Sequence, residues 1–158
     1  MGLRLHALLA EDLIVPELAA RDREGILREM ASVLKTRKRI AADAELAEKL
    51  AAREKLGSTA IGRGIAIPHC KLGGVGGPLV LLAVSRAGAA FDAADGKPAH
   101  LFFLVVTPPE DPALSLQILA AVARLARRAR SLLRRILAAA RASDILEIVR
   151  EEEEKSAA

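Results

Sequence analysis

The chain changes from helix to strand within one stretch, which reads REKLGSTAIGRGIAIPHC over residues 53–70. Charged residues come first, a glycine-rich loop follows, and the apolar run 65–67 comes next. Gly57 suits the position after a helix, where a positive φ is readily adopted. The residue before a proline is disfavoured in the helical region, so Ile67 is expected to be extended. The stretch therefore predicts a helix end, a loop and a strand that leads to His69.

Two apolar runs further along predict the centre of a sheet. They read LVLLAV over residues 79–84 and LFFLVV over residues 101–106. Neither run shows the alternation of apolar and polar residues that is typical of a strand with one solvent-exposed face. Strands that are covered on both faces carry such continuous runs. Apolar residues at helical spacing lie before and after this part of the chain, over residues 26–34, 46–50, 114–125, 132–137 and 145–149. The sequence therefore predicts one α/β sandwich.

Composition limits the kind of protein this chain forms. Its 158 residues suffice for one domain with a real core, and the core is aliphatic because Trp and Tyr are absent and only three Phe occur. Few aromatic rings are present to stack on bases, which argues against binding of single-stranded nucleic acid. Cys70 is the only cysteine, so no intramolecular disulfide or multi-cysteine zinc site is expected.

The N-terminus and the hydropathy pattern predict a cytoplasmic protein without membrane insertion. Glu11 and Asp12 interrupt the first apolar residues too early for a signal peptide. No apolar run approaches the roughly 20 residues of a spanning helix. The single cysteine fits a reducing compartment.

The net charge of +4 is unevenly distributed. One region is rich in arginine, with Arg124, Arg127, Arg128, Arg130, Arg134 and Arg135. We favour a solvated helix face for it, and a docking surface for an acidic partner is the alternative. Nucleic acid is not expected, because no binding motif accompanies the arginines. Residues 151–158 are predicted to form an acidic, frayed tail after a domain over residues 1–150.

His69 is the candidate for chemistry among three histidines. Only this one lies where strand, proline and loop would hold an imidazole at the surface. A free imidazole is largely neutral and nucleophilic near neutral pH, which suits a phosphoryl carrier. The transferred group spreads negative charge over three oxygens that need donors already in place. Ser58, Thr59 and Arg53 can supply them, and the planar fork of Arg pairs with two oxygens at once.

Other readings of these residues are weaker but open. A lone histidine in a surface loop often has no task. His69 and Cys70 are adjacent and lack further ligands at the usual spacing, which disfavours a metal site. A Cys70 nucleophile with His69 as its base is disfavoured, because such pairs are usually distant in sequence. Ser58 lacks the G-x-S-x-G surroundings of a hydrolytic serine.

The segments REKLGSTAIG and GIAIPH together resemble the active-site signature of enzyme IIA of the bacterial phosphotransferase system. The resemblance is to the fructose/mannitol class, most closely to its nitrogen-regulatory branch, and covers nearly the whole chain outside the acidic tail. It implies a single domain with a mixed β-sheet flanked by helices on both faces. It also implies that Nε2 of His69 accepts phosphate from a phosphohistidine of the small carrier HPr or of its nitrogen-branch counterpart.

The resemblance extends to the neighbours of His69. Arg53 matches the family's arginine near the site, and Ser58 and Thr59 match its Ser-Thr pair. Thr59 is the closer candidate to orient the imidazole or the phosphate. The family pattern places a second histidine where this chain has Ser115. A hydroxyl can bond a phosphoryl oxygen but carries no positive charge, so a weaker phosphorylated state is expected.

The resemblance implies a histidine phosphocarrier without a metal or organic cofactor. Transport members pass the phosphoryl group to a IIB domain, whereas nitrogen-branch members bind regulatory targets according to their phosphorylation state. A regulatory role is the favoured reading, and a transport IIA or a phosphotransfer-inactive binding module are the alternatives. Cys70 stands at a position where small residues are commoner in the family. It is interpreted either as a packing residue or as an exposed thiol that can oxidise. His100 is expected to be structural, with a role in place of the missing histidine left open.

Overall fold

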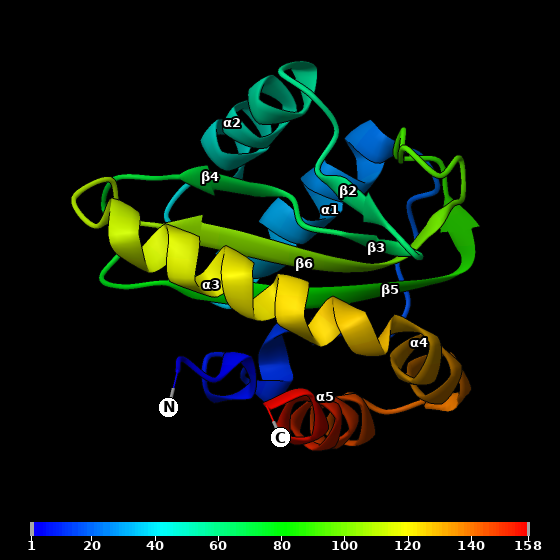
Figure 1. The fold of residues 1–158 in the computed structure, drawn as a ribbon. Coiled ribbons are helices and arrows are strands. Elements are labelled where there is room, and N and C mark those ends of the chain that lie inside the picture. The colour runs from blue at the N-terminus through cyan, green and yellow to red at the C-terminus, as the bar shows by residue number, and fades with distance from the viewer. Residues whose placement is uncertain (1, 158) are drawn as a thin grey trace.

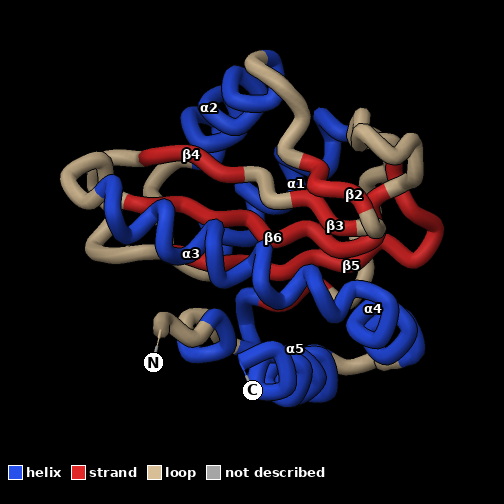
Figure 2. The backbone as a smooth tube through the Cα atoms, viewed as in Figure 1, coloured by secondary structure: helices blue, strands red, loops and turns tan. Residues whose placement is uncertain are grey.

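A six-stranded mixed sheet separates two layers of helices (Figures 1 and 2). The computed structural model describes residues 2–157. The strand order is β1-β5-β6-β3-β2, and β4 also pairs with β6. The two central strands β5 and β6 are antiparallel, whereas β1 runs parallel to β5, and β3 and β4 run parallel to β6. The predicted mixed sheet is confirmed.

The strands are β1 (Ile14–Val15), β2 (Ala60–Gly62), β3 (Ile65–Ala66), β4 (His69–Lys71), β5 (Leu79–Ala89) and β6 (Ala99–Thr107). The α-helices are α1 (Arg23–Thr36), α2 (Asp43–Lys55), α3 (Pro112–Leu125), α4 (Ala129–Ala138) and α5 (Ala142–Ala157). Short 3-10 helices are η1 (Leu5–Ala7), η2 (Glu11–Leu13) and η3 (Ala126–Arg128).

Each face of the sheet has its own apolar core, which explains why the run 79–84 of β5 and the run 101–106 of β6 contain no polar residue. One core joins α1 and α2 to residues such as Leu104 and Val106 of β6. The other joins α3, α4 and α5 to residues such as Phe103 and Val105. Successive strand residues point to opposite faces, so both halves of the alternation are buried here. The prediction of helices on both faces is confirmed.

Local capping agrees with the sequence in two of the helices. The Asp22 carboxylate accepts the Gly25 N–H at 2.7 Å and begins α1, and Asp111 accepts the Leu114 N–H at 3.1 Å and begins α3. Asp43 lies inside the first turn of α2, and Ala42 is the cap residue there. A carboxylate in the first turn still favours the helix through its dipole.

The acidic residues near the C-terminus do not form a frayed end, contrary to expectation. Helix α5 continues through them, and Glu152 and Glu153 are buried. The Glu152 carboxylate accepts hydrogen bonds from Arg128, Ser131 and Arg135. Burial alone would raise the pKa of Glu152, but these bonds outweigh it and lower the pKa to about 2. The expectation failed because the partners lie on another helix. The domain division at residue 150 stays a prediction.

Candidate functional site

His69 begins β4, a short strand beside α2 in Figure 1. It pairs with Val105 of β6 in parallel register. The backbone is tied to β6 on both sides of the histidine, because the Val105 N–H donates to the Pro68 carbonyl at 2.9 Å and the Leu72 N–H donates to the Thr107 carbonyl at 3.0 Å. These bonds fix where the imidazole leaves the main chain.

The register also fixes the face of the sheet that carries the ring. Neighbouring residues of paired strands point to the same side, and Val105 belongs to the core under α3, α4 and α5. Cys70 and Leu72 pack into the opposite core. The His69 side chain therefore leaves the sheet on the α3 side, where it is half-buried.

One hydrogen bond determines which imidazole nitrogen is free. His69 Nδ1 lies 2.7 Å from the carbonyl oxygen of Ile67. A carbonyl can only accept, so Nδ1 carries the proton in this contact, and in the neutral ring Nε2 keeps its lone pair. The ring is thereby oriented by its own strand, with Nε2 as its nucleophilic atom.

Arg53 lies in the last turn of α2, the helix that packs against β4. Its Nη1 donates to the carbonyl of Gly57 at 2.8 Å, so one donor of the guanidinium closes the helix end. No carboxylate pairs with this guanidinium among residues 2–157. An arginine has five N–H donors, so Arg53 has donors left for an anion.

Thr59 and Ser58 use their hydroxyls to hold the loop. Thr59 Oγ1 donates to the buried Glu54 carboxylate, which also accepts the Thr59 N–H at 3.1 Å. Ser58 Oγ donates to the carbonyl of Phe91. The Thr59 carbonyl accepts the Ile67 N–H at 2.9 Å, which links the loop to the strand before His69. Each hydroxyl has a single proton and uses it in these contacts, so both residues position the loop in this structure. Their role as donors to a phosphoryl group stays a prediction.

The sequence assigned no role to two charged residues of this region. Glu54 anchors the Thr59 loop, and its position in the last helical turn before the glycine-rich loop was the available signal. Lys71 lies two residues after His69 on the same strand, so it leaves the sheet on the same side. It is exposed, and no carboxylate pairs with it among the described residues. The two-residue period of a strand would have identified it.

Ser115 lies in the first turn of α3, the helix that covers the His69 face. It is half-buried, and no hydrogen bond holds its hydroxyl within residues 2–157. Thr107, paired with Lys71 on the same face, carries a buried hydroxyl that likewise has no partner among the described residues. Two hydroxyls are thus unpaired on the side of the sheet where the ring emerges.

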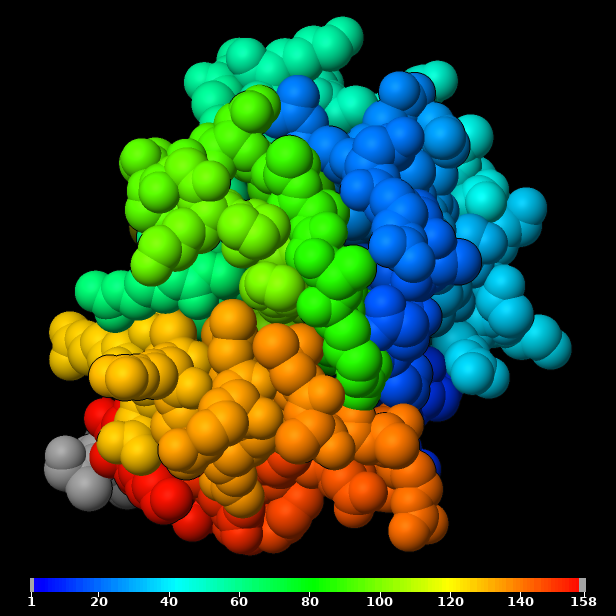
Figure 3. All heavy atoms as spheres, turned by 90° about the vertical axis from the view of Figure 1, so that its right-hand side faces the viewer, coloured from blue at the N-terminus to red at the C-terminus, as the bar shows by residue number. Residues whose placement is uncertain are grey.

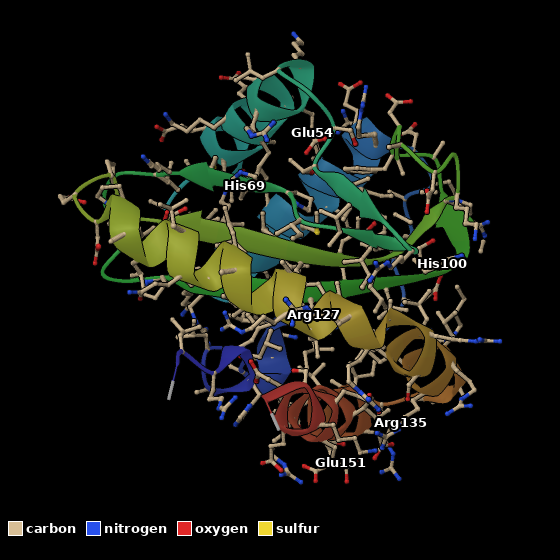
Figure 4. All side chains as sticks on the ribbon, in the orientation of Figure 1. Glu54, His69, His100, Arg127, Arg135 and Glu151 are labelled. Carbon is tan, nitrogen blue, oxygen red and sulfur yellow. The ribbon has the colours of Figure 1, made fainter. Side chains whose placement is uncertain are left out.

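Cys70 and His100 resolve two open expectations. Burial raises the pKa of the Cys70 thiol to about 11, against an opposing effect of Lys49, so packing and not reactivity explains this residue. His100 lies on β6, five residues before the partner of His69, which is about 16 Å along a strand. His100 therefore does not take the place of the missing histidine, and Figure 4 shows the two rings far apart on the sheet.

Two features of the described residues bear on the class of protein. Within residues 2–157, no three side chains of His, Cys, Asp or Glu come together as a metal site would require. None of the helices described there has the length and apolar character needed to cross a bilayer.

The fold and the site can be set against known proteins. A family model described as phosphoenolpyruvate-dependent sugar phosphotransferase system, EIIA 2, matches residues 7–152. A nitrogen regulatory protein of Pseudomonas aeruginosa is 34% identical over 128 residues, which are 80% of this chain and 82% of the relative.

Solved structures agree. The crystal structure of nitrogen regulatory protein IIA-Ntr from Neisseria meningitidis has a TM-score of 0.80 at 28% identity, over 92% of this chain and 98% of that one. Enzyme IIA of mannitol from Escherichia coli, solved in complex with phosphorylated enzyme IIB, has a TM-score of 0.71 at 18% identity, over 89% and 96% of the two chains, and shares the fold. The chain belongs to the EIIA 2 family of the phosphoenolpyruvate-dependent sugar phosphotransferase system.

Proposed function

We propose that this protein is a regulatory phosphocarrier that accepts a phosphoryl group on Nε2 of His69 from the phosphohistidine of an HPr-type protein. The observation that carries the proposal is the bond from His69 Nδ1 to the Ile67 carbonyl at 2.7 Å, because it leaves Nε2 unprotonated on a half-buried ring. Membership of the family supports a phosphocarrier role.

The proposed step is a direct transfer between two imidazoles. The lone pair of Nε2 attacks phosphorus, the new N–P bond forms, and the N–P bond of the donor breaks with its electron pair returning to the donor ring. The Ile67 carbonyl stabilises the positive charge that develops on the His69 ring, since it already accepts the Nδ1 proton. Loss of the phosphoryl group to a later acceptor is the same step in reverse.

The transferred group needs positive charge around its three oxygens. Arg53 supplies a guanidinium from the end of α2, and Lys71 supplies an ammonium from the same side of β4 as His69. Ser115 supplies a neutral hydroxyl from α3. The family pattern has its second histidine where this chain has Ser115. Lys71 thus offers a positive charge that the serine cannot supply.

Two exposed leucines near the ends of α2 and α3 support docking of a partner protein. Leu56 is 84% exposed at the C-cap of α2, and Leu116 is 69% exposed in the first turn of α3. Large apolar side chains at such exposure lower the free energy of association when a partner covers them. We propose that the HPr-type donor and the later target bind in turn over this side of the molecule.

The regulatory reading rests on the relatives named nitrogen regulatory proteins. A transport role is the second candidate, because the mannitol enzyme IIA that shares the fold was solved with a phosphorylated enzyme IIB. A binding module without phosphotransfer is the third, and Ser115 is the residue that favours it.

The deciding experiment is phosphorylation in a reconstituted system. The protein is incubated with phosphoenolpyruvate, the general phosphotransferase enzyme and HPr-type carriers, and label is followed by its lability in acid. We expect label on the wild type, none on His69→Ala, and undiminished label on the matched variant His100→Ala. Absence of label with every carrier tried would replace the proposal with the binding module.

A further inference from the structure

A pocket of about 530 Å³ lies at the opposite end of β6 from His69, and the proposed phosphotransfer does not use it. Its walls come from the turn between β2 and β3, the segment before β6, and helix α4. Figure 3 shows this side of the molecule, where green chain segments meet the orange α4. The lining residues are Arg63, Gly64, Lys97, Pro98, His100, Ala129, Arg130 and Leu133.

The backbone approaches too closely here for ordinary side chains. Gly64 has a φ of +82°, and a Cβ at this position would lie 2.6 Å from Leu133 Cδ2. Gly88 has a φ of +81°, and its Cβ would lie 2.8 Å from His100 Cε1. The His100 ring is held between these two glycines, and its Nδ1 donates to the Ser85 carbonyl at 2.9 Å. The floor of the pocket is therefore a fixed surface of ring and aliphatic carbon.

Three cations surround this floor. Arg63, Lys97 and Arg130 are all exposed, and none of them forms an ion pair with any residue the structure describes. Like charges gathered around one pocket repel each other unless an anion lies between them. One Arg63 donor reaches the Ala126 carbonyl at 3.3 Å, so this guanidinium is held beside the pocket.

Asp95 positions two of the cations. Its carboxylate accepts the backbone N–H of Arg63 at 2.9 Å and of Lys97 at 3.0 Å. The bond from Arg63, followed by that from Lys97, holds the pKa of Asp95 below its usual range. Asp95 does not line the pocket and forms no ion pair with the side chain of Arg63 or Lys97 among the described residues, although the Lys97 charge also lowers its pKa.

The arginines of this region fall into two groups. Arg128 and Arg135 are used by Glu152 of α5 and have a structural part. Arg130 faces the pocket, whereas Arg127 and Arg134 are exposed beside it and do not line it. The region is thus neither a wholly solvated face nor one uniform basic surface.

We infer that this pocket binds a small phosphate monoester with an apolar organic part. The phosphate would lie among Arg63, Lys97 and Arg130, because planar guanidinium groups pair with two phosphate oxygens at once. The organic part would lie on the His100 ring, Pro98 and Leu133. A volume of about 530 Å³ accommodates a ligand of this kind.

Phenyl phosphate is the probe for the test, and binding is followed by calorimetry and by NMR shifts of backbone amides in the full chain. Saturable binding is expected, with shifts at Gly64, Lys97 and His100. Benzyl alcohol, which lacks the charge, and inorganic phosphate, which lacks the ring, should each bind at least about tenfold more weakly, since charged hydrogen bonds and apolar burial both contribute.

Variants locate the binding. Arg130→Gln should weaken it about five- to tenfold, whereas the matched variant Arg134→Gln, which removes the same charge outside the pocket, should change it less than twofold. Leu133→Trp, checked for folding by circular dichroism, should abolish it by filling the space. His69→Ala should bind the probe normally, so failure of the proposed phosphotransfer would leave this result intact. No saturable binding, or equal losses in Arg130→Gln and Arg134→Gln, would overturn the inference.

Discussion

At the scale of single residues, two neighbours in the sequence lie in different environments. His69 and Cys70 are adjacent, but the strand directs them to opposite faces of the sheet. The imidazole emerges on the α3 side with Nε2 free, and the thiol packs against the α1 and α2 core. A single step along the strand thus separates the proposed phosphoryl acceptor from a buried thiol.

Cys70 is expected to react slowly with alkylating reagents. Its pKa of about 11, against an ordinary value of 9.0, lowers the thiolate fraction about a hundredfold near neutral pH. The rate with iodoacetamide should rise about tenfold per pH unit from 7 to 10 without reaching a plateau. The protein unfolded in urea provides the control, and a plateau near pH 8 in the folded protein would contradict the assignment.

Lys71 is expected to stabilise the phosphorylated state. Lys71→Gln should shorten the lifetime of phosphohistidine on His69 severalfold, because a cation on the same face of β4 is lost. The matched variant Lys55→Gln, at the end of α2, should have little effect. Hydrolysis of the purified phosphoprotein measures both, and equal lifetimes for Lys71→Gln and the wild type would remove this lysine from the site.

Ser115→His should act in the opposite direction. An imidazole at this position restores a group that can carry positive charge where the hydroxyl cannot. The lifetime of the phosphorylated form should increase, with Gln117→His, two residues further along α3, as the matched control. An unchanged lifetime would show that Ser115 does not face the phosphoryl group.

At the scale of elements, the loop between α2 and β2 is held at both ends. Glu54 closes its start through Thr59, and the Thr59 carbonyl receives the Ile67 N–H. Arg53 also reaches back to this loop at Gly57. The residues of the signature therefore act as one connected unit, in which the hydroxyls and the carboxylate position the strand that orients His69.

Glu54→Ala is expected to loosen this unit. Removing a buried acceptor leaves the Thr59 N–H and hydroxyl unpaired, which should lower the free energy of unfolding by about 1–3 kcal/mol. Phosphorylation of His69 should slow as well. Urea unfolding and label incorporation measure the two effects, and Glu48→Ala, on the exposed side of α2, is the control. Unchanged stability would mean that the carboxylate is dispensable.

At the scale of the whole molecule, buried charge joins the C-terminal helices. Glu152 has no exposed surface and receives Arg128 from the start of α4 and Arg135 from its last turn. The pKa of Glu152 is lowered from 4.5 to about 2. A carboxyl with a lowered pKa stabilises the fold above its ordinary value, and that stabilisation is lost as pH falls through the folded pKa.

Acid should therefore weaken the protein between about pH 4.5 and 2. Glu152→Gln should lower the free energy of unfolding at pH 7 by on the order of 3 kcal/mol, because Arg128 loses its charged partner and Arg135 keeps only Glu151. It should also flatten the dependence on pH in that window. Glu147→Gln removes an exposed pair with Arg150 and should cost less than about 1 kcal/mol. Denaturant unfolding as a function of pH tests both, and equal losses would contradict the account.

The sequence predicted those parts of the fold that local pattern determines. The apolar runs of β5 and β6 and the helical spacing over residues 26–34 and 114–125 are such parts. The strands β2 and β4 were not predicted, because three residues are too few to show a period, and pairing with distant strands forms them.

The same limit applies to the site. His69 and its half-exposed position followed from the local signature, whereas the partners of its neighbours did not. Ser58 bonds the carbonyl of Phe91, and Arg128 bonds Glu152, across separations that no local pattern encodes. The two-residue period of a strand would have predicted that Lys71 lies on the same face as His69. That prediction required knowing that residues 69–71 form a strand, which the sequence did not indicate.

The hydrogen bonds of Glu153 to the Leu5 and His6 backbone have a practical consequence. They join the first and last helical segments on the side of the molecule away from the β4 edge, as Figure 1 shows for both chain ends. A pair of fluorescent dyes attached to these segments would report native structure by strong energy transfer. Such a pair would follow unfolding in real time while the surface around position 69 stays free of dye.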